Sequence, residues 1–376
     1  MKWKHVLRYP FDIRIAEKHL SAGPPSRLNC DDVTIGLDLF TDQMLFDCGR
    51  HLTCIAASAN KIDSHVVLRC NRLMLAAIAH KSHGRQFLSM PNVRWISPHE
   101  SFPSDSLVLM DIDRSCANRS LDGQRSVAML IGREVVPQAP VMPYPMHPNQ
   151  INESTDQRVE SFRSQPKAGI FFAGNQKTRY GRETMQNEFG VLPRLAILSE
   201  LRRCFPDRIA ARDSAGSDDR IVLRDSATDP IAGKDWMTVL AAHRFFLCCP
   251  GASQPVCHNV IEAMSVGAIP LIEYSDRFHP ELVDGVNAIC FQGCRGLVDA
   301  VRRIDSMSEQ KRSLLTENVC DYFDEHLDGA TFLKRLRDSR NTDSIDQISM
   351  PFHDRNFFSP ESAPSGRAPI GHTRAA

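Results

Sequence analysis

The feature that most constrains the fold of this chain is the segment 244–272, which reads as a buried strand, a tight turn, a helix and a second buried strand. The apolar run RFFLCC opens the segment and stops at Pro250-Gly251, as a strand does where it meets a turn. An apolar stripe with helical spacing follows the turn. The residues of this stripe are Cys257, Val260, Ile261 and Met264. Strand and helix in alternation predict an α/β domain.

The same segment places polar groups where the helix begins beside a glycine. Pro255 suits the start of the helix, Gly267 suits a left-handed residue just past its end, and 268–272 predicts the next strand. The free N–H groups and the positive dipole end of such a helix attract a diphosphate. Glu262, one turn further on, can accept hydrogen bonds from both hydroxyls of a ribose. We therefore predict that this helix holds a nucleoside diphosphate.

The amino-acid sequence of this segment resembles that of a known family. EAM followed by VGAIPLI, after a PG turn and before YSDRFHPEL, resembles the donor-binding segment of glycosyltransferases with the two-domain GT-B fold, especially the exostosin-type branch. The resemblance implies that Glu262 contacts the donor ribose and that the turn and the start of the helix contact phosphates. The positions that match are Pro250, Gly251, Ser253, His258, Asn259 and Glu262.

One position departs from the family pattern. Many retaining members carry a second glutamate eight residues earlier, where this chain has Gln254. A glutamine can hydrogen-bond, but it carries no negative charge beside a developing cationic sugar. Gln254 is therefore kept as a donor-binding candidate, and the sequence leaves open whether the enzyme inverts or retains the anomeric configuration.

A second group of candidates follows another predicted strand. The apolar run 168–173 (AGIFFA) ends at Gly174-Asn175, and three cations follow in the loop: Lys177, Arg179 and Arg182. Guanidinium groups match phosphate oxygens well, so this loop is predicted to meet the diphosphate at the same sheet edge as the Glu262 helix. IFFAGN also resembles the strand that opens the second domain of exostosin-like transferases. The resemblance covers about 170–291, one third of the chain.

The remaining apolar runs predict two α/β domains and a tail. The strands expected in the first domain are 65–70, 93–97, 106–113 and 126–132, with a helix at 71–80. The strands expected in the second are 168–173, 209–212, 221–224, 244–249, 268–272 and 288–291, with helices at 192–205, 234–243 and 297–304. Five prolines in 137–148 predict a stiff connector.

These elements give predicted domains at 1–150, 151–337 and a disordered tail at 338–376, because few apolar residues follow Asp338. The GT-B resemblance implies two Rossmann-like domains facing across a cleft, the first on the acceptor side. It also implies that the helical stretch 308–337 crosses back toward the first domain.

Composition limits the partners. Forty-five basic residues balance 45 acidic ones, so no overall charge attracts nucleic acid or membrane, and the partner is expected to be small. The twelve cysteines show no paired CxxC spacing, which favours free thiols in a reducing compartment. The N-terminal residues lack a signal-peptide core and a membrane span, so the sequence predicts a cytoplasmic protein.

The predicted activity is transfer of a sugar from a nucleoside-diphosphate sugar to a glycan or other hydroxyl acceptor. Cations and helix N–H groups would stabilise the departing diphosphate, so no metal or cofactor is required. A base for the acceptor hydroxyl is expected from the first domain. The candidates for this base, each at the end of a predicted strand, are His99, Glu100, Asp111 and Asp113.

Two other functions remain open. Asp111 and Asp113 in SLVLMDID could hold a divalent ion and its diphosphate, as in metal-dependent GT-A glycosyltransferases. Alternatively, a protein with this fold could bind a nucleotide or a glycan without turnover, since fold does not fix function. The uncharged Gln254 keeps the second possibility open.

Overall fold

The computed structural model describes residues 3–22, 34–112, 124–132, 135–151, 156–210, 220–339 and 345–352 of the 376-residue chain. The chain divides into two compact units, Met1–Pro140 with Ile345–Ala376, and Val141–Ser344. The division falls inside the proline-rich segment 137–148. Each unit is an α/β structure around its own parallel sheet.

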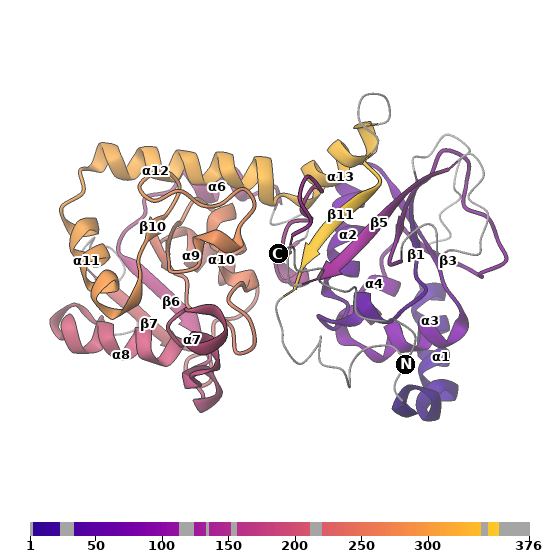
Figure 1. Ribbon diagram of the computed structural model, residues 1–376, viewed down its shortest axis with the longest axis horizontal. Coiled ribbons are helices and arrows are strands. Elements are labelled where there is room, and N and C mark those ends of the chain that lie inside the picture. Colours follow the sequence, from indigo (N-terminus) through magenta and orange to yellow (C-terminus); the bar gives the residue numbers. More distant parts are fainter. Residues whose placement is uncertain are drawn as a thin grey trace, which may run out of the picture. The chain divides into compact units, whose positions relative to one another are not determined.

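The sheet of the first unit has strand order β11-β5-β4-β1-β2-β3, with all neighbours parallel (Figure 1). The strands are β1 (Thr34–Asp38), β2 (His65–Arg69), β3 (Val93–Ile96), β4 (Leu107–Met110), β5 (Arg125–Gly132) and β11 (Gln347–Pro351). The helices are α1 (Trp3–Ala22), α2 (Arg50–Lys61), α3 (Arg72–His80) and α4 (Ser82–Leu88). This is the doubly wound order 3-2-1-4-5-6, which reverses between β1 and β4.

The predicted strands of the first domain are confirmed as β2, β3, β4 and β5, and the predicted helix as α3, which the side chain of Asn71 caps. The central strand β1 was missed. Its sequence, TIGLD, contains a glycine and ends in Asp38, so it does not read as a buried run. The glycine is required, because a Cβ at Gly36 would lie 2.8 Å from the ring of Phe102.

The expectation of disorder from Asp338 onward is wrong for the stretch that forms β11. This strand adds to the first sheet beside β5, in parallel register. Ile348 and Met350 are buried there. The hydroxyl of Ser349, which lies between them, accepts a hydrogen bond from the backbone N–H of Val136. Two buried apolar residues were too weak a signal against the polar composition around them.

The sheet of the second unit has order β10-β9-β8-β6-β7, again parallel throughout. The strands are β6 (Ile170–Gly174), β7 (Ile221–Asp225), β8 (Phe245–Leu247), β9 (Ile269–Ile272) and β10 (Ile289–Cys290). Numbered along the chain this order is 2-1-3-4-5 read from the other edge, and the direction of winding reverses between β6 and β8.

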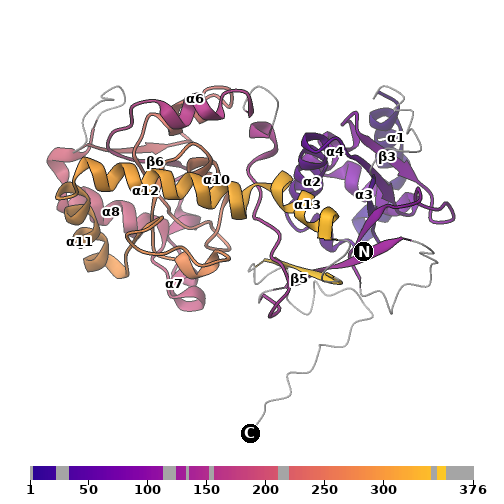
Figure 2. The same cartoon turned by 90° about the horizontal axis from the view of Figure 1, so that it is seen from above.

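The helices of the second unit are α6 (Val159–Ser164), α7 (Thr184–Phe189), α8 (Arg194–Cys204), α9 (Trp236–Ala241), α10 (His258–Ser265), α11 (Gly293–Asp305), α12 (Glu309–Tyr322) and α13 (Gly329–Asp338). Helices α8 and α11 pack together, and α10 packs against α9 and α12 (Figure 1 and Figure 2). A π-helical turn, Phe323–Leu327, follows α12.

Most predicted elements of this unit are confirmed. The exception is the strand expected at 209–212: Ile209 forms only an isolated bridge to Ile221, and the residues from 211 lie outside the described part of the chain. Gly267 has φ +77° just after α10, as predicted for a left-handed residue. The described cysteines are free thiols, and no described helix is long and apolar enough to cross a bilayer.

A buried ion pair joins neighbouring strands of the first sheet. Arg69 on β2 donates from Nε to Oδ1 of Asp38 at 3.1 Å and from Nη2 to Oδ2 at 2.6 Å, and its guanidinium lies over the ring of Phe102. Both charged side chains are almost completely buried. Burying a charge costs free energy that its partner offsets, so removing either partner of a buried pair destabilises the fold.

We expect Arg69→Met to lower the free energy of unfolding by about 3–5 kcal/mol, because it removes the guanidinium that pairs with the buried Asp38 carboxylate. The double variant Asp38→Leu, Arg69→Met should lose less than this single variant. As a control, Arg303→Met removes a similar two-pronged contact to Asp284 at the surface and should cost less than about 1 kcal/mol. Urea unfolding measures all three; equal losses for Arg69→Met and Arg303→Met would contradict the expectation.

Candidate functional site

A cavity of about 450 Å³ lies at the carboxyl ends of β6 and β8, where the winding of the second sheet reverses. Such crevices are where doubly wound sheets bind ligands, and the volume is in the range of small-molecule sites. Its lining residues come from the loops after β6, β7 and β8, the N-terminal part of α10, α9 and the segment before α6. The lining includes Gly174, Asn175, Tyr180, Arg194, Ser226, Gly251, Cys257, His258, Asn259, Glu262, Trp236, His147, Asn149 and Gln150.

One end of the cavity is built around Arg194, the first residue of α8. Its guanidinium donates two hydrogen bonds to the carbonyl of Pro250 and one to the carbonyl of Asn175. It also lies over the ring of Tyr180, 3.9 Å from the centroid. Arg194 is buried (7 % exposed), and among the described residues no carboxylate pairs with it. This end of the cavity therefore carries a positive charge that an anion can neutralise.

The other end is built around Glu262, whose side chain has no exposed surface. Oε1 accepts hydrogen bonds from the backbone N–H of His147 at 2.7 Å and from Nδ1 of His258 at 2.9 Å, and Oε2 accepts from Nε1 of Trp236 at 2.5 Å. Burial on its own raises the pKa of a carboxyl, but here the His258 ring and the other donors hold the pKa of Glu262 below its ordinary value. The carboxylate is therefore ionised at neutral pH.

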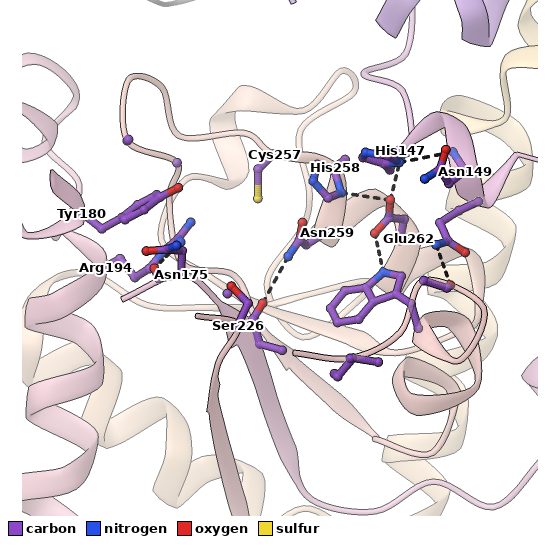
Figure 3. Close-up of a pocket in the computed structure, with 18 of the residues that line it drawn as sticks. His147, Asn149, Asn175, Tyr180, Arg194, Ser226, Cys257, His258, Asn259 and Glu262 are labelled. Atoms are coloured by element: carbon purple, nitrogen blue, oxygen red, sulfur yellow. Dashed lines mark hydrogen bonds and ion pairs between the residues drawn. The ribbon is translucent and has the colours of Figure 1, made fainter. Parts of the chain in front are cut away.

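The start of α10 lies between these two ends (Figure 3). No side-chain hydrogen bond caps this helix, and Cys257, which lines the cavity, immediately precedes its first N–H groups. A thiol is a weak acceptor, so these N–H groups stay available to a stronger one. Asn259 holds the helix to the end of β6 by donating to the carbonyl of Ala173 at 3.2 Å.

The structure separates the twelve predicted donor-binding residues into two groups. The residues that line the cavity are Gly174, Asn175, Gly251, His258, Asn259 and Glu262. The residues outside its lining are Lys177, Arg179, Arg182, Pro250, Ser253 and Gln254. Pro250 still contributes indirectly, because its carbonyl holds Arg194.

The three predicted cations lie at the surface for a local reason. The turn after β6 forms a short 3-10 helix, Thr178–Gly181, which exposes Lys177, Arg179 and Arg182. The guanidinium of Arg179 lies over the ring of Tyr180 and donates to its hydroxyl. Gln254 donates instead to the hydroxyl of Tyr144 at 3.3 Å. The buried cation beside this loop is Arg194, which belongs to α8.

Sequence reasoning missed several cavity residues besides Arg194. His147 lies in the predicted connector 137–148, Asn149 and Gln150 directly follow it, and Trp236 starts a helix that was predicted without any role at the site. These residues meet at the site only through the fold. The one available signal for Arg194 was an arginine at the start of a predicted helix, directly after Pro193.

Of the candidates for the base, His99 and Glu100 lie in a surface turn of the first unit. His99 and Glu100 are exposed in the turn after β3, where Glu100 accepts the backbone N–H of Ser97 at 2.7 Å; this contact lowers the pKa of its carboxyl. Asp113 lies outside the described residues. Among described residues, no group of three His, Cys, Asp or Glu side chains is arranged to hold a metal ion.

Asp111 has a structural role at the point where the first sheet reverses. Its oxygens accept hydrogen bonds from the N–H groups of Phe40 and Thr41, both at 2.8 Å, and from the Thr41 hydroxyl at 2.7 Å. Burial raises the pKa of Asp111 to about 6 in spite of these donors. The carboxylate that was considered as a metal ligand ties the end of β4 to the loop after β1.

Comparison with known proteins finds solved structures that are similar to this chain at low sequence identity. No family model matches this sequence, and no curated protein matches it. The chain is similar to the solved structure of Anabaena HepE in complex with UDP, at 12 % identity and a TM-score of 0.42, over 81 % of this chain and 98 % of that one. Sucrose-phosphate synthase from Thermosynechococcus elongatus is similar at 10 % identity and a TM-score of 0.38, over 81 % and 98 %.

A third similar structure is WaaG, a glycosyltransferase involved in lipopolysaccharide biosynthesis, at 11 % identity and a TM-score of 0.35, over 82 % of this chain and 100 % of that one. The likeness to the exostosin-type branch stays a prediction from the motif.

We expect Arg194→Lys to weaken the binding of inorganic pyrophosphate by about tenfold or more, because one ammonium group cannot replace the guanidinium contacts to Pro250 and Asn175 and still meet an anion. The matched control, Arg182→Ala, removes an exposed cation outside the cavity and should change the affinity less than about threefold. Calorimetric titration measures both variants. A larger loss in Arg182→Ala would place the anion site outside this cavity.

Proposed function

We propose that the second unit binds a nucleoside-diphosphate sugar and that the protein is a glycosyltransferase. The observation that carries the proposal is the cavity at the reversal point of the sheet, where the buried Arg194, which pairs with no carboxylate of the described residues, lies at one end and the N-terminus of α10 lies beside it. Guanidinium and helix N–H groups are the two protein features best suited to a diphosphate. The motif around Glu262, which resembles GT-B donor sites, supports the same proposal.

Two glycines at the cavity are needed for the loops after β6 and β8 to pack as they do. A Cβ at Gly174 would lie 2.8 Å from the Phe172 ring and 3.3 Å from Nη1 of Arg194, and a Cβ at Gly251 would lie 2.6 Å from the carbonyl oxygen of Gln254. Any larger residue would push the loops after β6 and β8 into new positions. Both loops border the cavity beside Arg194, so we assign this end, together with the start of α10, to the phosphates.

In the proposed reaction, the bond between the anomeric carbon and the β-phosphate oxygen breaks and its electron pair stays on the phosphate. The acceptor hydroxyl forms the new bond to the anomeric carbon and releases its proton to a base or to water. Arg194 and the α10 N–H groups stabilise the charge that grows on the diphosphate, so the proposed transfer is metal-independent. The base is proposed to come from the first unit, with His99, Glu100 and Asp113 as the candidates.

The proposal is tested with a panel of UDP-, GDP-, ADP- and CMP-sugars. We expect one of them to raise the melting temperature, because a ligand that binds only the folded state at one hundred times its Kd stabilises that state by about 2.7 kcal/mol. Slow hydrolysis of the same compound, with EDTA present, would show turnover without a metal. If no compound shifts the melting temperature, the proposal is wrong; binding without hydrolysis or transfer would leave a binding protein.

A further inference from the structure

The contacts of Glu262 leave it little capacity for a ligand. A carboxylate has about four acceptor positions, and three protein donors already occupy this one: the His147 N–H, Nδ1 of His258 and Nε1 of Trp236. The side chain is also completely buried, although it forms part of the cavity wall. Glu262 therefore acts on the cavity through the residues that it holds.

These contacts determine the tautomer of His258. An ionised carboxylate only accepts hydrogen bonds, so the ring must carry a proton on Nδ1, which lies 2.9 Å from Oε1. In the neutral ring, Nε2 then bears a lone pair and no proton. Protonation of the ring occurs at Nε2 and turns that nitrogen from an acceptor into a donor.

The Nε2 edge of His258 is available to a ligand. The side chain lines the cavity and is 29 % exposed, and no other residue of the described chain hydrogen-bonds to it. Its titratable neighbours are Glu262 and Cys257 on α10 and His147 on the segment before α6, whose ring stands edge-on at 5.3 Å (Figure 3). Nδ1 of His147 accepts the N–H of Asn149, so that nitrogen carries no proton. The positive charge of Arg194 lies at the other end of the cavity (Figure 3).

We propose that His258 binds a phosphate of the donor only as an imidazolium, so that nucleotide-sugar binding takes up one proton, and that Glu262 positions the ring and stabilises its charge. This inference rests on the proposed function and deepens it. A neutral His258 would turn a lone pair toward an anionic oxygen, whereas the imidazolium donates a charge-assisted hydrogen bond. In this scheme Glu262 is a positioning residue and makes no contact with the ribose hydroxyls.

The first test measures affinity against pH with UDP-, GDP- and ADP-glucose, whose diphosphates carry a fixed charge near neutral pH. Because binding takes up a proton, affinity falls as pH rises, by about tenfold per unit once the free ring is neutral. Calorimetry in two buffers with different ionisation enthalpies should count close to one proton taken up above that point. Affinity that does not change over the pH range in which nitrogen NMR shows the His258 ring losing its proton would overturn the inference.

Variants assign the proton to His258. We expect His258→Asn to bind the donor more weakly than the wild-type protein at pH 6. Its affinity should be the same at pH 6 and pH 8, because an amide donates a hydrogen bond but does not titrate. Glu262→Gln should shift the loss of affinity to lower pH, since the neutral amide no longer stabilises the imidazolium. As a matched control, Glu273→Gln replaces a half-buried carboxylate that accepts the N–H groups of Leu192 and Gly293 outside the cavity, and the pH profile should not move.

Nitrogen NMR of labelled protein gives a readout that is independent of binding. The wild-type His258 ring should show the proton on Nδ1 at high pH, and Glu262→Gln should raise the population of the other tautomer. If Glu262→Gln does not fold, His258→Asn alone still decides the proton linkage. A wild-type ring that carries its proton on Nε2 at pH 8 would contradict the assignment.

A comparison with 2′-deoxy donors separates this inference from a ribose contact. If Glu262 bound both ribose hydroxyls, Glu262→Gln would weaken the ribonucleotide sugar more than the 2′-deoxy compound, which keeps only the 3′-hydroxyl. We expect the variant to weaken both compounds by the same factor. The two failures are distinct: no binding of any donor to the wild-type protein defeats the proposed function, whereas binding with a selective loss of the ribonucleotide defeats only the role given to His258 and Glu262.

Discussion

The buried carboxylate of Glu262 is the interaction on which the geometry of the site depends. It joins three parts of the second unit that are far apart in sequence: the segment at His147, the start of α9 at Trp236, and α10 itself. A charge with no exposed surface is tolerated only when its acceptor positions are filled, so these parts are held in one arrangement. The far wall of the cavity is thereby fixed before any ligand arrives.

Arg194 has the matching role at the near wall. Its three hydrogen bonds tie the loop after β6 to the turn after β8, and its guanidinium covers the ring of Tyr180. The partners are carbonyl dipoles, so the contacts orient the cation without neutralising it. Hydrogen bonds to the buried carboxylate of Glu262 at one end and from the buried guanidinium of Arg194 at the other shape this cavity, together with apolar packing.

The two sheets use equivalent positions in different ways. In the second unit the reversal point between β6 and β8 opens into the cavity. In the first unit the reversal point lies between β1 and β4. There the carboxylate of Asp111 accepts hydrogen bonds from the backbone N–H groups of Phe40 and Thr41, in the loop after β1. A protein carboxylate thus fills the place in which a doubly wound sheet can hold an anionic ligand. This difference is consistent with a nucleotide site in the second unit.

The sequence by itself determined the α/β class, the strands with continuous apolar runs and the strand–turn–helix unit at 244–272, because burial on both faces of a parallel sheet leaves a pattern in the chain. It missed β1, since Asp38 and Gly36 are acceptable there only because Arg69 and Phe102 lie beside them. Only the tertiary structure decided which polar residues form the site. Lys177, Arg179 and Arg182 read as anion ligands but are exposed, whereas Arg194, His147 and Trp236 reach the cavity from separate elements. Periodicity records which face of an element is buried, and it carries no information on which side chains from distant elements meet.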